Sequence, residues 1–255
     1  MSLCSDSFRK KRSNLLLALV FIALSSSAQT NDFQQWEWIT IKSDISKKFS
    51  ASVQCQMRVI DNSTKVGTLF LEPNIGYKIN KYLRIGVGYR YSFRAGNSGL
   101  LNRTAQRYNI DLEGRKKFGK FTLKLRTRFQ QGFMDFYMNE NRAPGSYPIY
   151  NRNKFGIDYQ FNKIWSLFTE FELYLPLNKP QQRNFDRFRF TLGSSLDLKN
   201  RNTLDCFFRI QKQLNTANPE TDFIIGLGYA YDVKLSKKKK KDKDKKDEKN
   251  KKEKE

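Results

Sequence analysis

The chain has 255 residues, no histidine and three cysteines, and its formal net charge at pH 7 is +23. The lack of histidine excludes catalysis by an imidazole base, as in Ser-His hydrolases, and the sequence contains no metal-ligand spacing, phosphate loop or nucleotide-binding motif. We therefore expect no enzyme activity, no catalytic residues, no cofactor and no metal site.

Residues 1–28 have the features of a secretory signal peptide. The basic residues 9–12 precede an apolar run at 15–24, and the small residues Ser26 and Ala28 follow. This order is typical of a cleaved signal, and ten apolar residues are too few for a helix that spans a bilayer. We expect cleavage near Ala28, and export from the cytoplasm argues against nucleic acid as a partner of this basic chain.

Residues 29–48 form an N-terminal segment in which we expect one short strand. Its sequence QWEWITIKS, at 35–43, alternates like a strand. Because barrels made from a single bacterial chain have even numbers of strands, we interpret this segment as a short extra strand or an inward-folded arm. The main barrel is then expected at 49–235.

Ten segments between residues 49 and 233 alternate between apolar and polar side chains, which is the period of a β-strand. Most contain 11 to 14 residues, whereas strands average about 5 or 6 in soluble proteins and need about 9 to 11 to cross a membrane. The expected fold is all-β, an up-and-down antiparallel transmembrane β-barrel of about 10 strands, within a range of 10 to 12. The segments are 49–60, 67–79, 82–94, 104–117, 121–133, 150–161, 164–176, 187–198, 203–213 and 222–233.

The connections between the segments alternate in length. Short turns lie at 80–81, 118–120, 162–163 and 199–202, and longer loops lie at 61–66, 95–103, 134–149, 177–186 and 214–221. This alternation is typical of outer-membrane barrels, whose periplasmic turns are short and whose external loops are long. We expect an integral protein of the outer membrane of a Gram-negative bacterium.

The apolar phase of each segment is expected to face lipid, and the polar phase is expected to face the lumen. Tyr and Phe of the apolar phase collect near segment ends, as interfacial girdles do. An Arg on the lipid face would cost about 2 to 4 kcal/mol near the midplane. In segment 82–94, Leu83 and Val87 should meet lipid, and Gly86 and Gly88 should make room for lumenal arginines.

Polar-phase side chains predict a narrow, charged lumen. Opposed Arg and carboxylate groups fill such a lumen by pairing, but an arginine-rich lumen also suits a pore for small anions. A structural barrel and a narrow pore for small polar or anionic solutes both stay open. Glu170 and Glu172 share one strand face about 7 Å apart, and ion pairing explains them better than glycoside hydrolysis. The lumen-lining candidates are Arg84, Arg90, Arg94, Arg107, Arg126, Arg128, Glu170, Glu172, Arg187 and Arg189.

Several segments resemble a family of small Gram-negative outer-membrane barrels that is known as a domain of unknown function. The resemblance lies in 74–94 (NIGYKINKYLRIGVGYRYSFR), 151–161 (NRNKFGIDYQF), 223–233 (FIIGLGYAYDV) and the Trp-x-Trp of Trp36 and Trp38, and it covers 36–235. It implies the fold and the location, and it carries no catalytic or binding residues to transfer.

The last segment resembles the signal that barrel-assembly machinery reads, with Gly226, Tyr229 and Tyr231 at the usual spacing. We expect this machinery and outer-membrane lipid as partners, and the oligomeric state stays open. Residues 236–255 are expected to be a disordered Lys-rich tail. The alternative function is that of a soluble periplasmic β-barrel that carries an apolar ligand, with the apolar phase turned inward.

Overall fold

The computed structural model describes residues 31–96, 99–134, 149–178 and 184–234, and the predicted signal peptide and Lys-rich tail lie outside them. One 3-10 helix, η1 (Lys199–Arg201), accompanies the strands, and no helix in these ranges is long and apolar enough to cross a bilayer. The described strands are β1 (Asn31–Asp44), β2 (Phe49–Ile60), β3 (Lys65–Lys78), β4 (Leu83–Arg94), β5 (Arg103–Phe118), β6 (Phe121–Met134), β7 (Ile149–Gln160), β8 (Trp165–Pro176), β9 (Arg187–Asp197), β10 (Asn202–Gln213) and β11 (Thr221–Val233).

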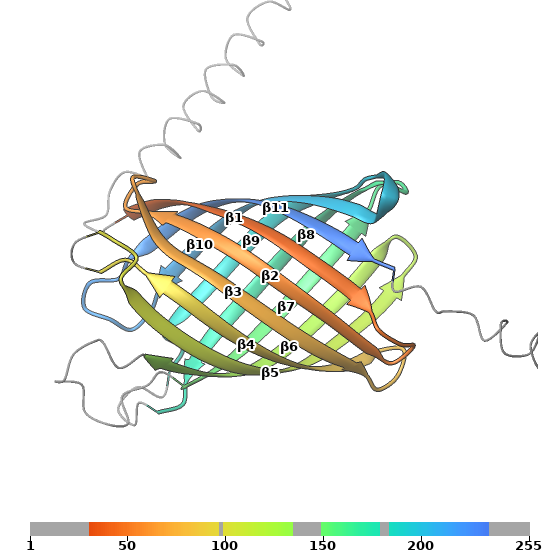
Figure 1. Ribbon diagram of the computed structural model, residues 1–255, viewed down its shortest axis with the longest axis horizontal. Helices are drawn as coiled ribbons and strands as arrows, with labels where there is room; N and C mark the ends of the chain where they lie inside the picture. Colours follow the sequence, from red (N-terminus) through yellow and green to blue (C-terminus); the bar gives the residue numbers. More distant parts are fainter. Residues whose placement is uncertain (1–30, 97–98, 135–148, 179–183, 235–255) are drawn as a thin grey trace, which may run out of the picture.

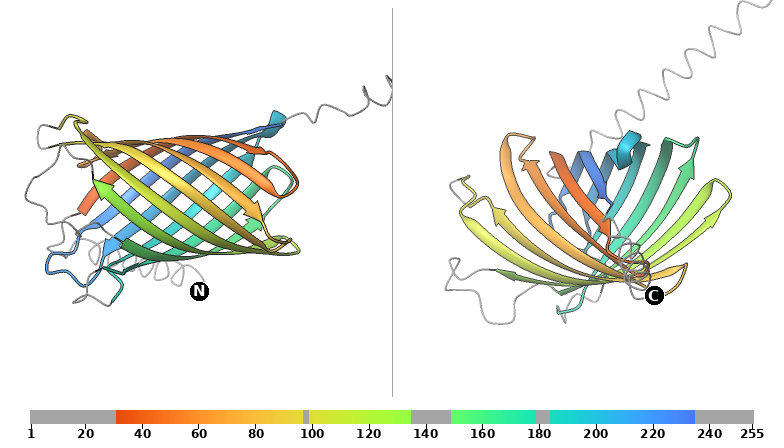
Figure 2. Two further views of the ribbon diagram at one scale, coloured as in Figure 1. Left: turned by 60° about the horizontal axis from the view of Figure 1, so that its bottom comes forward. Right: turned by 45° about the vertical axis from the view of Figure 1, so that its right-hand side comes forward.

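The strands form one closed barrel in which each strand pairs with its neighbours in the sequence. All consecutive pairs are antiparallel, from β1–β2 to β10–β11, and β1 closes the barrel against β11 in parallel. In Figure 1 the arrowheads of β1 and β11 accordingly point to the same end. Figure 2 shows the tilt of the strands around the barrel axis from two other directions.

β1 corrects the expectation of a short strand within 29–48 that stands apart from the main barrel. It contains 14 residues, pairs with β2 from Gln35 to Asp44, and pairs with β11 from Asn31 to Ser43. In β1, Ile39 is exposed outside and Trp36 is buried inside, and pairing with strands on both sides satisfies the backbone groups of β1. The count of eleven lies within the expected range, but the even-number rule does not hold here.

The barrel has apolar side chains outside and polar side chains inside, as a transmembrane barrel requires. Ile75, Val87 and Leu125 are more than half exposed on the outer face, whereas Glu72 and Glu172 are 3% and 5% exposed inside. The predicted lipid-facing positions Leu83 and Val87 are both exposed outside. This arrangement contradicts the alternative of a soluble carrier, which requires an apolar lumen, and agrees with the expected polar lumen.

The two ends of the barrel differ in their connections. We call the end with connections 45–48, 79–82, 119–120, 161–164 and 198–201 the short-turn end, and the other the long-loop end. At the long-loop end, the expected loop 61–66 contains only residues 61–64, because β3 begins at Lys65. Asp61, Asn62 and Ser63 all have positive φ angles, which makes this reversal tight.

The expectation that Gly86 and Gly88 make room for arginines is wrong. Gly88 lies between Asn74 and Asn109 in the strand register, and a Cβ there would lie 2.1 Å from Oδ1 of Asn74. Gly76 has the expected role instead, since a Cβ there would lie 2.2 Å from Nε of Arg84. The register decides which side chain each glycine admits, and alternation alone does not specify it.

Gly228 provides a test of the parallel closure. It lies opposite Trp38 across β1 and β11, and a Cβ at Gly228 would lie 1.8 Å from Cε2 of that indole. Gly228→Ala is expected to lower the free energy of unfolding by about 1 to 3 kcal/mol through overpacking, measured by urea unfolding in detergent micelles. Gly114→Ala is the control, because its nearest contact would be Cβ of Leu125 at 3.8 Å. Equal stability of the two variants would contradict the Trp38–Gly228 packing.

Candidate functional site

The lumen is built from charged side chains that alternate with outward-facing residues along each strand. The register of β6 and β7 places Arg126 opposite Lys154 and Arg128 opposite Arg152. Like charges directly opposite one another destabilise a sheet. These four cations therefore depend on carboxylates that other strands supply.

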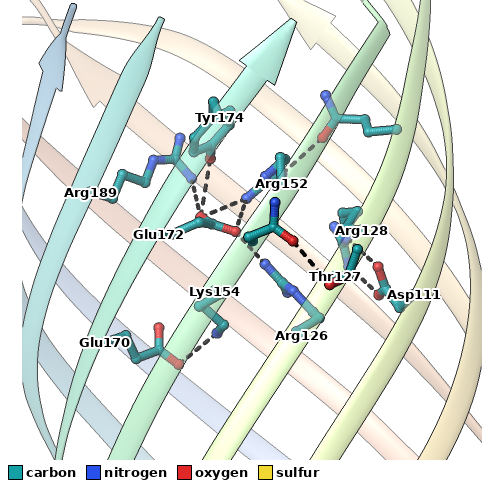
Figure 3. A network of polar contacts seen from close by, with 12 residues as sticks. Asp111, Arg126, Thr127, Arg128, Arg152, Lys154, Glu170, Glu172, Tyr174 and Arg189 are labelled. Carbon is teal, nitrogen blue, oxygen red and sulfur yellow. Dashed lines mark hydrogen bonds and ion pairs between the residues drawn. The ribbon is translucent and has the colours of Figure 1, made fainter. Parts of the chain in front are cut away.

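Glu172 on β8 is the first of two carboxylates that gather several arginines. Its Oε1 accepts a hydrogen bond from Arg126 at 2.5 Å, and Nη2 of Arg152 donates to both of its oxygens at 2.9 Å. Nη1 of Arg189 lies 3.7 Å from Oε2, and the Tyr174 hydroxyl donates to the same oxygen at 3.2 Å. Figure 3 shows cations from β6, β7 and β9 meeting at this one carboxylate.

Glu72 on β3 is the second such carboxylate. Arg90 and Arg107 both donate to its Oε2, the latter at 3.1 Å, and Nη1 of Arg128 lies 3.7 Å from its Oε1. Arg128 also donates to both oxygens of Asp111 at 2.6 Å, as Figure 3 shows. Charge-assisted pairs of this kind are the strong hydrogen bonds of proteins, so they fix the side chains on one side of the lumen.

Aromatic rings in the lumen hold arginines by their faces. Cζ of Arg58 lies 3.7 Å from the ring centroid of Trp36 and 5.2 Å from the ring centroid of Phe70. Cζ of Arg209 lies 4.4 Å from the ring of Phe207. A ring face attracts a guanidinium group, so Arg58 is stabilised without a carboxylate. The buried lumenal aromatic residues are Trp36, Phe70, Tyr174 and Phe207.

Two cavities follow one another inside the barrel. The central cavity has a volume of about 670 Å³, and twelve of its lining residues are Arg or Lys against four that are Glu or Asp. The short-turn cavity has a volume of about 580 Å³ and reaches the short-turn end. Both are lined by Lys124, Arg126, Lys154 and Glu170. Nζ of Lys154 lies 2.6 Å from Oε1 of Glu170 in this shared wall.

Comparison with protein families identifies the group to which this barrel belongs. The profile described as "Protein of unknown function (DUF2490)" matches residues 33–222. The chain belongs to the DUF2490 family. The match confirms the resemblance that we noted in the hairpin segments and in the Trp-x-Trp motif, which is to a family of outer-membrane barrels of unknown function. A search of curated proteins finds no match to this DUF2490 chain.

Several solved structures resemble the DUF2490 barrel. The beta domain of the Bordetella autotransporter BrkA has 9% sequence identity and a TM-score of 0.43, over 73% of this chain and 84% of that one. The KdgM porin in complex with disordered oligogalacturonate has 16% identity and a TM-score of 0.42, over 74% and 92% of the two chains. Outer-membrane expressed OmpT of Vibrio cholerae has 7% identity and a TM-score of 0.38, over 65% and 54%.

The structure places nine of the ten lumen candidates of this DUF2490 chain around the central cavity. Arg84 is the exception: it lines the short-turn cavity, where its Nη2 donates to Oγ of Ser50 at 2.8 Å. Within the central cavity, Arg94 and Arg187 form no ion pair with a described acidic residue. The nine residues are Arg90, Arg94, Arg107, Arg126, Arg128, Glu170, Glu172, Arg187 and Arg189.

Arg58, Arg152 and Arg209 also line the central cavity, as the polar phase of their strands in this DUF2490 chain requires. Sequence reasoning missed the lumenal aromatic residues, although a signal existed, because Phe70 and Phe207 occupy the polar phase of their strands. An aromatic residue in the polar phase of a barrel strand can pack only against the lumen.

The carboxylates of the lumen are engaged in ion pairs. Glu170 is bound by Lys154, and Glu172 is bound by Arg126, Arg152 and Arg189. This arrangement agrees with the expectation of ion pairing over glycoside chemistry. Within the described ranges, no group of three or more His, Cys, Asp or Glu residues is placed to hold a metal ion.

Proposed function

We propose that this chain is a narrow pore for small polar or anionic solutes. The observation that carries the proposal is the succession of two cavities along the lumen, which share the lining residues Lys154 and Glu170. The short-turn cavity reaches the turn residue Lys81, and the central cavity reaches Tyr150 and Arg187 at the opposite ends of their strands. Together they line the barrel from end to end.

The charge of the central cavity favours anions. Its twelve basic residues outnumber its four acidic ones, and Arg58, Arg94 and Arg187 have no acidic partner among the described residues. Fixed cations that line a narrow passage attract anions and repel cations. The solutes are small because large side chains such as Trp36 and Tyr174 occupy much of the lumen.

The proposed location is the outer membrane of a Gram-negative bacterium, reached after signal-peptide cleavage near Ala28. The apolar outer face supports this proposal, as do aromatic pairs near the short-turn end: the ring centroids of Phe49 and Tyr77 lie 5.0 Å apart, and those of Phe161 and Trp165 lie 4.9 Å apart. Aromatic residues of this kind mark membrane interfaces. Insertion by barrel-assembly machinery and the absence of enzymatic chemistry belong to the same proposal.

A closed barrel with a structural role is the second candidate, favoured by the packing of Trp36 against arginines and by the ion pairs of Glu172. Current through purified, folded protein in planar bilayers distinguishes the two. The pore proposal expects discrete, small single-channel currents. No current at any applied voltage, from protein that shows heat-modifiable migration on gels, would support the closed barrel.

Arg94 and Arg187 are the cations whose removal should weaken anion selectivity with the least damage to the fold. Neither has an ion-pair partner in the described structure, so R94Q/R187Q removes charge without leaving a carboxylate unpaired. The chloride-to-potassium permeability ratio is expected to fall severalfold, as measured from reversal potentials. The control is K65Q, at the long-loop end, where Lys65 pairs with Asp61. A ratio unchanged in R94Q/R187Q would contradict the assigned role.

A further inference from the structure

Every connection at the short-turn end carries an exposed lysine. The five turns contain Lys47 and Lys48, Lys81, Lys120, Lys163 and Lys199, respectively, and the first of the two lysines in 45–48 is counted with the other four below. None of the five forms an ion pair within the described ranges of the chain. The positive charge at this end is therefore not neutralised by the turns themselves.

Three acidic residues near the short-turn end lie at the barrel mouth. Asp44, Glu113 and Asp232 all line the short-turn cavity. Glu113 lies 3.7 Å from Nη1 of Arg84, and Asp232 lies 3.8 Å from Nη1 of Arg201. Glu113 and Asp232 thus pair with arginines at this end and with none of the turn lysines.

Lysines at this end also lie over aromatic rings on the outside of the barrel. Nζ of Lys48 lies 5.8 Å from the ring centroid of Tyr77, and Nζ of Lys116 lies 4.7 Å from that of Phe118. Both rings are exposed. Aromatic rings of a barrel girdle lie at the level of lipid headgroups, so the ammonium groups beside them lie at the same level.

Among the described residues, the connections of the long-loop end do not each carry a lysine. They contain the acidic residues Asp61, Asp186 and Glu220. Lys65, at the start of β3, pairs with Asp61 at this end. The rim with a lysine in every turn therefore lies in one membrane leaflet.

We propose that Lys120, Lys163 and Lys199, the three of these lysines that do not line the short-turn cavity, form a lysine collar that binds anionic phospholipid headgroups in the leaflet at the short-turn end. The headgroup supplies a phosphate, and the ammonium group supplies hydrogen-bond donors and opposite charge. A soluble polyanion is the less suitable partner, because the lysine–aromatic contacts place the charge around the barrel wall. The proposal rests on the proposed membrane location.

Trp165 makes the collar measurable. It is exposed on the outer face, stacks on Phe161 and directly follows the turn that contains Lys163. The other two tryptophans, Trp36 and Trp38, line the central cavity. Lipids brominated near the headgroup quench tryptophan that they touch, so quenching of the full-length protein in vesicles reports lipid around Trp165.

The experiment compares brominated phosphatidylglycerol with brominated phosphatidylcholine in mixed vesicles. One lysine contact at an anionic surface is worth about 1 kcal/mol, so the anionic lipid is expected to be preferred roughly fivefold. The variant K120Q/K163Q/K199Q removes the lysines of three neighbouring turns, and its preference ratio of phosphatidylglycerol over phosphatidylcholine is expected to fall close to one. The control K65Q/K212Q changes lysines at the long-loop end and is expected to keep it.

The outcomes separate the collar from the membrane location. Equal quenching by the two lipids in the wild type, or a preference that survives in K120Q/K163Q/K199Q, would overturn the collar alone. No quenching by either lipid would overturn the membrane location and the collar with it. Exposed turn lysines contribute no packing, so each variant is expected to fold. Heat-modifiable migration on gels verifies that the barrel of each variant is folded.

Discussion

Replacing Trp36 by alanine is expected to destabilise the barrel by about 3 to 5 kcal/mol and to increase its single-channel conductance. The indole is 3% exposed, and its Nε1 donates to Gln34 at 3.0 Å. Arg58 packs over its face, and the ring of Phe207 meets it edge-on at 6.5 Å. Truncation removes these contacts and leaves space that water and ions can enter. Urea unfolding in micelles and bilayer recordings measure the two effects.

Trp165→Ala is the matched control for Trp36→Ala. Trp165 is 41% exposed on the outer face, where its Nε1 donates to Oγ of Ser194 at 2.7 Å, and neither residue lines the central cavity. Its truncation is expected to leave conductance unchanged. If the two variants had the same conductance as the wild type, Trp36 would not restrict the passage.

Glu172→Gln is expected to cost about 3 kcal/mol or more of unfolding free energy, because removing one partner of a buried ion pair leaves the other uncompensated. Here the loss of one negative charge affects Arg126, Arg152 and Arg189 together. The glutamine keeps the size of the side chain, so packing is preserved and the charge alone changes. Urea unfolding in micelles at neutral pH gives the difference from the wild type.

The pair of Glu113 and Arg84 provides the comparison for Glu172→Gln. Their charged atoms lie 3.7 Å apart, and the Glu113 side chain is 38% exposed at the short-turn mouth. Solvent-exposed pairs contribute less than about 1 kcal/mol, so Glu113→Gln is expected to have a small effect. If Glu113→Gln lost as much unfolding free energy as Glu172→Gln, the buried ion pairs of the lumen would stabilise the barrel no more than this exposed pair.

Alternation predicted most of the fold because lipid and lumen impose opposite demands on neighbouring residues. In β4, Val87 faces outward and Arg90 faces inward, as their phases require. The parallel closure was not predictable in this way. Whether β1 joins the barrel depends on the fit of Trp36 and Trp38 against β11, where Gly226 and Gly228 leave space that only long-range pairing creates.

The charged lumen was predictable as a set of residues but not as a set of contacts. The phase placed Arg126 and Arg189 inside the barrel, but they lie on β6 and β9, and only the register and tilt bring both to Glu172. The same limit explains the glycines. Gly88 lies beside Asn109 and not beside an arginine because the pairing of β4 with β5 fixes its neighbour.

The most direct test of the anion-selective pore is the reversal potential of the folded, full-length protein in a planar bilayer that separates concentrated from dilute KCl. The excess of basic residues around the central cavity predicts a reversal potential with the sign of chloride selectivity. A reversal potential with the sign of potassium selectivity, or the absence of current at every voltage, would contradict the account.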